Sequence, residues 1–201
     1  SWNLYQWPSK IEKIKDACSL RVMTVSRKLQ QIISSEEKML NNRVMKIKSA
    51  VIGFKKVGDS NRIDYFAGEA AALHGHLENI HDKAVELNER EENLDSTLTE
   101  FMELERLMKE FSPIFQLWTT YSDSISDISN WKTCSFWDLD KIEVVNKIEN
   151  WKHGSSNLIS YFKKERIRDP CKIAENFEEH VFAFNTYLEV IKTLKNPALE
   201  T

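Results

Sequence analysis

Residues 111–140 read FSPIFQLWTTYSDSISDISNWKTCSFWDLD, and the spacing of the apolar side chains in and before this stretch decides the fold class. Apolar positions recur there at steps of three and four: Phe101, Leu104, Met108, Phe111, Phe115 and Trp118, then Ile125, Ile128 and Trp131. Such spacing places the side chains on one face of an α-helix. We therefore predict a helix from about Thr99 to Lys132 with a heavily aromatic packing face. Asp138 or Asp140 is expected to cap the next helix.

Pro113 lies inside this predicted helix. Proline has no backbone N–H and therefore removes one hydrogen bond of the helix, which favours a kink near residues 110–112. A break into two helices is the alternative. Pro113 is the candidate hinge of the chain.

Four tryptophans are the candidate packing or docking residues. Trp118, Trp131 and Trp151 fall on apolar helix faces and are expected in the core. Trp137 lies in a predicted loop, where it could staple the loop onto the bundle or dock against a neighbouring domain. The staple is favoured, because an aromatic residue before a helix N-cap commonly packs back on its helix.

The first hundred residues predict two long helices. Ile11, Ile14, Cys18, Val22, Val25, Leu29 and Ile32 form an apolar stripe that resumes at Leu40, Val44, Ile47, Val51 and Phe54. The next helix has an unbroken heptad seam: Ile63, Phe66, Ala70, Leu73, Leu77, Ile80, Ala84 and Leu87. Residues 58–61, Gly-Asp-Ser-Asn, break the chain between them. We expect an antiparallel hairpin, followed by a junction within residues 93–99.

The last sixty residues predict two further helices. One runs from about Lys141 to Glu165 and the other from about Cys171 to Leu194, with Arg168-Asp169-Pro170 as the loop between them. Pro197 ends the second, since the residue before a proline is driven out of the α region. The fold class is thus all-α: an elongated series of antiparallel hairpins or bundles of long helices.

Composition agrees with this fold class and excludes several functions. Five glycines and four prolines in 201 residues, with 29% charged residues, are typical of all-α chains. The net charge is −3 with both signs interspersed, which favours neither nucleic acid nor an anionic membrane as a partner. No apolar run approaches the roughly 20 residues that span a bilayer. Basic groups at residues 46–56 and 163–168 are expected to be solvated helix faces.

The three cysteines, Cys18, Cys134 and Cys171, are widely spaced and odd in number. They indicate a reducing cytoplasm rather than a disulfide framework. The first residue is Ser1 and not an initiator Met, and both ends read as cuts in something longer.

No pattern predicts catalysis or a cofactor. The five glycines fit neither GxxxxGK[ST] nor GxGxxG, so we expect no nucleotide site and no enzyme activity in this fragment. His74, His76 and His81 lack the i, i+4 spacing of helical metal ligands, and we expect no metal. The cysteines and His180 offer no paired nucleophile and base.

Several motifs resemble the dynein heavy chain family of axonemal type. They occur in the family's order: YQWP at 5–8, FQLW at 115–118, SNW at 129–131, FWDLD at 136–140, Trp151, KIAENFEEHV at 172–181 and LKNPAL at 194–199. The resemblance covers nearly the whole chain, although no single motif is diagnostic. It matches the passage from the tail of the heavy chain into the linker of its motor.

The resemblance implies a domain division and a role. Residues 1–95 would be the last helical hairpin of the tail, and residues 96–201 the three helices that begin the linker. The segment would transmit force without catalysis in an ATP-driven, minus-end-directed microtubule motor of cilia and flagella. ATP and Mg would bind in the ring of the full-length protein. Partners would be other heavy-chain domains, intermediate and light chains, neighbouring heavy chains and the microtubule assembly, in the cytoplasmic cytoskeleton and axoneme. The alternative is an independent coiled-coil or spectrin-like adaptor that binds protein partners.

Overall fold

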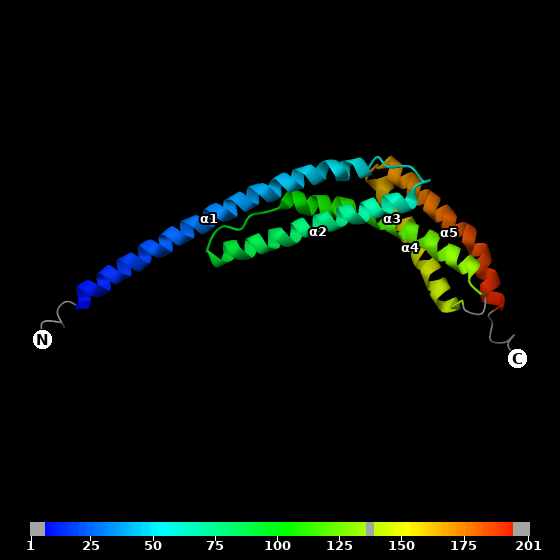
Figure 1. The fold of residues 1–201 in the computed structure, drawn as a ribbon. Helices are drawn as coiled ribbons and strands as arrows, with labels where there is room; N and C mark the ends of the chain where they lie inside the picture. The colour runs from blue at the N-terminus through cyan, green and yellow to red at the C-terminus, as the bar shows by residue number, and fades with distance from the viewer. Residues whose placement is uncertain (1–6, 136–138, 195–201) are drawn as a thin grey trace. The chain divides into compact units, whose positions relative to one another are not determined.

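The computed structural model describes residues 7–135 and 139–194, and all regular structure in these residues is helical (Figure 1). Five long helices follow one another: α1 (Trp7–Phe54), α2 (Ile63–Asn93), α3 (Met102–Thr133), α4 (Lys141–Lys164) and α5 (Arg168–Leu194). They pack as antiparallel neighbours, so the all-α prediction is confirmed. Among the described residues no helix is apolar over enough of its length to cross a membrane.

Contacts divide the chain into two compact units. Unit 1 holds residues 1–45 and 79–102, and unit 2 holds residues 46–78 and 103–201. Helices α1 and α2 each contribute to both units. The predicted boundary between tail and linker at residues 95 and 96 is a functional division. The contacts do not test it, and it stays a prediction.

The heptad seam of α2 is buried along almost its entire length. Seven of its apolar positions are less than 9% exposed: Ile63, Ala70, Leu73, Leu77, Ile80, Ala84 and Leu87. In unit 1, α1 lies antiparallel to α2, with Arg90 donating to Glu36 at 2.6 Å. The small side chains of the seam let the two backbones approach closely, which is how such long helices gain most of their stability.

The junction between α2 and α3 is organised by a buried carboxylate. Glu91 is 4% exposed, and its two oxygens accept hydrogen bonds from the backbone N–H and the hydroxyl of Thr99, at 2.7 and 2.6 Å. Asp95 lies in the left-handed region with φ 51°, where the chain leaves the helix. The loop at residues 94–101 therefore has a defined conformation held from within unit 1.

Helices α4 and α5 form a second antiparallel hairpin, in unit 2. Asp140, one of the two residues predicted for this role, caps α4, because its Oδ1 accepts from the N–H groups of Ile142 and Glu143 at 2.8 and 3.2 Å; the other, Asp138, lies outside the described residues. The helix ends where Arg166 adopts φ 58° and the N–H of Ile167 donates to the Phe162 carbonyl at 2.9 Å. This pattern closes a helix C-terminus by satisfying its last carbonyl groups.

The prediction of a loop at residues 168–170 is wrong. Helix α5 already begins at Arg168, and Pro170 is its third residue. The N–H groups of a helix's first turn have no partner within the helix, so a proline there removes no hydrogen bond. Asp169 in the same turn also favours the start of a helix, since a negative charge is stabilised at its positive end.

Candidate functional site

Helix α3 carries most of the residues singled out from the sequence, and it is the centre of unit 2. The middle of the helix buries Phe111, Ile114, Leu117 and Trp118, all of which are 0% exposed. Acidic residues occupy its first turn and Lys132 its last, as the helix dipole favours. The predicted aromatic packing face therefore exists, and two groups of aromatic contacts lie along it.

The first group joins α3 to the end of α1 and the beginning of α2, and we call it the proximal cluster. Its ring pairs are Phe54 with Phe111 at 5.5 Å, Phe66 with Trp118 at 5.1 Å and His74 with Phe115 at 4.1 Å, between centroids. The hydroxyl of Ser122 donates to Asp64 at 2.8 Å. These pairings run in opposite directions along α2 and α3, so the two helices are antiparallel in unit 2.

The second group joins the other half of α3 to α4 and α5, and we call it the distal cluster. Its ring pairs are Tyr121 with Phe177 at 5.1 Å, Trp131 with Trp151 at 5.5 Å and Trp131 with Phe184 at 5.6 Å. Lys147 on α4 contacts Asp127 on α3 at 2.9 Å. Trp118 of the proximal cluster and Tyr121 of the distal cluster are three residues apart, and Ser122, which contacts α2, lies beyond Tyr121, so the two clusters meet within about one turn of α3.

The structure places three of the four candidate tryptophans in these clusters. Trp118 is 0% exposed and Trp151 is 6% exposed, whereas Trp131 is half-buried. Trp137 lies outside the described residues. The Nε1 of Trp118 is buried and meets no hydrogen-bond acceptor among the described residues. A role of any of these side chains in docking stays a prediction.

Helix α3 continues through Pro113 as one helix from Met102 to Thr133. Pro113 is partly exposed, and its neighbours Phe111 and Ile114 are fully buried. The missing backbone hydrogen bond therefore lies beside the proximal cluster, where packing holds the helix on both sides. The role of Pro113 as a hinge stays a prediction.

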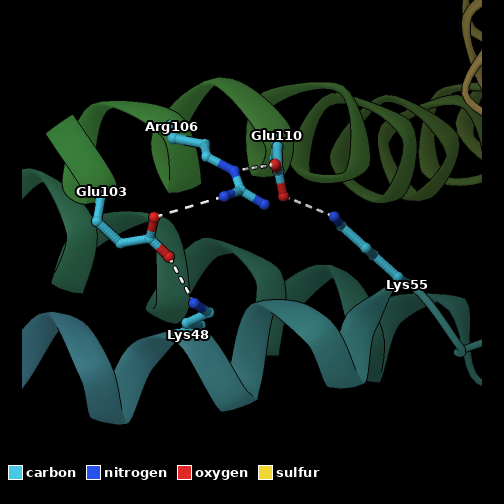
Figure 2. A network of polar contacts seen from close by, with 5 residues as sticks. All are labelled: Lys48, Lys55, Glu103, Arg106 and Glu110. Carbon is cyan, nitrogen blue, oxygen red and sulfur yellow. Dashed lines mark hydrogen bonds and ion pairs between the residues drawn. The ribbon is translucent and has the colours of Figure 1, made fainter.

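Five charged residues tie the end of α1, where Lys55 follows the last helical residue Phe54, to the first turns of α3, also within unit 2 (Figure 2). Lys48 contacts Glu103 at 2.7 Å and Lys55 contacts Glu110 at 2.6 Å. Arg106 lies between the two carboxylates on α3, at 3.6 Å from Glu103 and 2.8 Å from Glu110, so each carboxylate meets two cations (Figure 2). We call this set the ion-pair network.

The network shifts the titration of its members. The hydrogen bond from Lys48 lowers the pKa of Glu103, and those from Lys55 and Arg106 lower the pKa of Glu110. The pKa of Arg106 is raised, chiefly by its hydrogen bond to Glu110. Because the lysine and glutamate side chains are about a third exposed and that of Arg106 is 64% exposed, solvent screens them, and the network positions α3 more than it stabilises the fold.

Sequence reasoning missed the ion-pair network and the Glu91–Thr99 contact. The i, i+3 and i, i+4 spacing of Glu103, Arg106 and Glu110 was the available signal within α3. Their lysine partners, on the last turns of α1 and just past its end, are some 55 residues away along the chain, and only the packing of unit 2 reveals them.

The arrangement is suited to packing and offers no catalytic chemistry within the described residues. His74 stacks on Phe115 and contacts Glu78 at 3.5 Å, while His76 is exposed. No three His, Cys, Asp or Glu residues of the described part gather as metal ligands would. Burial lowers the pKa of His180 and raises that of the Cys171 thiol, which disfavours the charged form that a nucleophile or acid would use.

Comparison with known proteins finds matches in one family. Residues 104–201 match the family model of the dynein heavy chain, N-terminal region 2. Over 98% of its length the chain is similar to axonemal dynein heavy chain 1: 26% identical to the mouse protein, and 24% identical to the rat and the human proteins. It spans only 5% of the mouse and human proteins and 4% of the rat protein. No solved structure matches.

The family match begins at Leu104, two residues after α3 begins, and it includes all of α4 and α5. It therefore covers the whole distal cluster and the α3 side of the proximal cluster, and it includes Arg106 and Glu110 of the ion-pair network but not Glu103. Residues 104–201 belong to N-terminal region 2 of the dynein heavy chain family, and the chain as a whole is a distant relative of axonemal dynein heavy chain 1.

Proposed function

We propose that this chain is a non-catalytic, force-transmitting segment of an axonemal dynein heavy chain, where the tail passes into the linker of the motor. Residues 1–95 would end the tail and residues 96–201 would begin the linker. The motor would be driven by ATP, with Mg, in a ring elsewhere in the heavy chain. It would move along microtubules of cilia or flagella towards their minus ends.

The observation that supports this proposal is the position of α3 in unit 2. One uninterrupted helix of 32 residues holds the rings of the proximal cluster from Phe111 to Trp118 and those of the distal cluster from Tyr121 to Trp131. Displacing α4 and α5 relative to the tip of the α1–α2 hairpin requires either breaking hydrogen bonds of α3 or separating interdigitated aromatic side chains. Close-packed interiors of this kind have low compressibility and transmit strain.

The ion-pair network adds a second connection between the end of α1 and α3, beside the proximal cluster in unit 2. Lys48 on α1 and Lys55 just past its end are seven residues apart, and they hold Glu103 and Glu110, which are also seven residues, or about two turns, apart on α3. Two contacts at equal spacing resist rotation of α3 against α1 better than one. This matches a segment that must keep its direction under load.

The experiment replaces Phe111 by alanine in the full-length heavy chain and measures microtubule gliding and ATP turnover together. Phe111 is 0% exposed and contacts Phe54, so its removal loosens the proximal cluster without touching a nucleotide site. We expect gliding velocity to fall while microtubule-stimulated ATP turnover persists. Gln116→Ala, at an exposed position of the same helix, is the matched control and should change neither.

Other outcomes separate the alternatives. If Phe111→Ala left the gliding velocity unchanged, force transmission through α3 would be rejected. If the segment only recruits partners, as an adaptor does, Phe111→Ala motors attached to a glass surface should glide microtubules and turn over ATP at normal rates. Loss of ATP turnover in step with velocity would instead indicate that the segment supports the ring.

A further inference from the structure

Helix α1 carries an exposed apolar stripe in unit 1 that the force-transmitting role does not explain. Its members lie on one face at steps of three and four, and the apolar ones are 41–67% exposed: Ile11, Ile14, Val22, Val25 and Leu29, with the exposed Cys18 among them. From Ile11 to Ile32 the stripe covers six turns, about 33 Å of helix. A continuous exposed apolar strip of this length marks an interaction surface.

The stripe continues the face that α2 covers further along α1. Ile33, Leu40 and Val44 are 8%, 5% and 3% exposed, because α2 lies against them. Arg90, in the last turn of α2, contacts Glu36, and α2 ends at Asn93. The part of α1 before this contact runs on beyond α2 with the same spacing of apolar residues. A surface with heptad-like spacing fits another helix.

The apolar faces of the other described helices are already packed within the chain. Those of α3, α4 and α5 are buried in unit 2, as Ile114, Ile148 and Phe177 show with 0% exposure. The helix that fits the stripe therefore has to come from outside the described residues.

Charge decides which kind of helix fits. Residues 7–32 contain two acidic residues against six basic ones, a net charge of +4 in a chain whose total is −3: Lys10, Lys13, Lys15, Arg21, Arg27 and Lys28. A second copy of this chain would bring the same positive charge against it, which opposes self-association. An acidic helix would gain ion pairs at the edges of the seam.

We propose that residues 11–32 of α1 are the docking surface for an acidic amphipathic helix supplied by a separate partner chain. Its apolar side chains would cover the stripe, and its Glu or Asp residues would flank Lys15, Arg21 and Lys28. This inference is independent of the force-transmitting role, because it concerns unit 1 and can be tested by binding alone.

The test uses a synthetic four-heptad helix with Leu at its seam positions and Glu beside them, and a matched helix with Lys in place of Glu. We expect the acidic helix to bind the 201-residue chain and the Lys helix to bind about tenfold more weakly or not at all, with affinity falling as salt is added. Cys18 reports the site directly: its alkylation should slow when the acidic helix binds, while that of the exposed Cys134 should not.

Two substitutions in the same turns of α1 locate the surface. Val22→Asp places a charge on the stripe and should weaken binding at least about tenfold, since one buried valine contributes that much. Leu20 is two residues away and 68% exposed, on the opposite side of the helix, so Leu20→Asp should bind normally. Circular dichroism checks that both variants stay helical.

Three results would overturn the proposal. Equal binding of the acidic and the Lys helix would show that charge does not select the helix that binds the stripe. A concentration-dependent dimer that protects Cys18 would make the occupant a second copy. Protection of Cys18 in a full-length heavy chain stripped of accessory chains would make the occupant another part of the heavy chain itself.

Discussion

Truncating Trp118 should be the most damaging single change in unit 2. The side chain is 0% exposed and lies at 5.1 Å from Phe66, next to the turn where the proximal cluster gives way to the distal one. Replacing a buried tryptophan by alanine removes its transfer free energy and leaves a cavity. We therefore expect Trp118→Ala to cost about 3–5 kcal/mol of unfolding free energy.

Trp118→Phe separates packing from polarity at the same position. It keeps most of the buried ring and removes an Nε1–H that has no acceptor among the described residues. A buried unsatisfied donor costs about 1–3 kcal/mol, so its loss should offset much of the lost volume. Trp118→Phe is expected to be close to neutral, far from the alanine variant.

Thermal unfolding followed by far-ultraviolet circular dichroism measures both effects. For a chain of this size, about 3–5 kcal/mol corresponds to a fall in Tm of about 6–20 °C. Trp131→Ala is the comparison, because this side chain is only half-buried and should cost clearly less. The reasoning would be refuted if Trp118→Phe were as damaging as Trp118→Ala, or if Trp131→Ala matched the latter.

Three further predictions concern the backbone, the junction and pH. Pro113→Ala should restore a hydrogen bond of α3, and slower amide exchange in the adjoining turns would check it; unchanged exchange would exclude Pro113 as the compliant point. Glu91→Ala should cost about 1–3 kcal/mol and speed amide exchange at Thr99, whose N–H it leaves without its acceptor; protection that survives would show that the carboxylate does not hold the junction. The lowered pKa of Glu110 means that its ion pairs stabilise the chain above its ordinary pKa of 4.5 and are lost as pH falls through the lowered value. The lowered pKa of His180 favours its neutral form in the folded state, so stability should already decline as pH falls below 6.5. In urea titrations at several pH values, Glu110→Gln should remove the lower loss and His180→Asn the upper one, and unchanged profiles would contradict both assignments.

The fold followed from the sequence wherever a helix face is long and uninterrupted. The seam of α2, from Ile63 to Leu87, was readable because its steps of three and four continue without a fault. Asp140 was readable as a cap, because an aspartate before a periodic apolar run accepts the first free N–H groups of a helix. Both features depend on neighbours within one or two turns.

The features that could not be predicted from the sequence depend on residues far away along the chain. The stripe from Ile11 to Leu29 has the same spacing as the buried seam, and periodicity shows an amphipathic face without showing what covers it. Helix α1 has 48 residues and α2 has 31, so part of the apolar face of α1 extends beyond the residues that α2 covers. The contact between Lys55 and Glu110 likewise requires two helices to be placed side by side.

The central claim is that α3 makes the proximal and distal clusters one mechanical body, and pulling on unit 2 tests it most directly. Optical-tweezer handles attached at residues 46 and 194 would load the chain across both clusters. We expect one cooperative transition in which the two clusters unfold together, at lower force in Phe111→Ala. Two separate transitions, with the α4–α5 hairpin released while the tip of the α1–α2 hairpin stays folded, would contradict it.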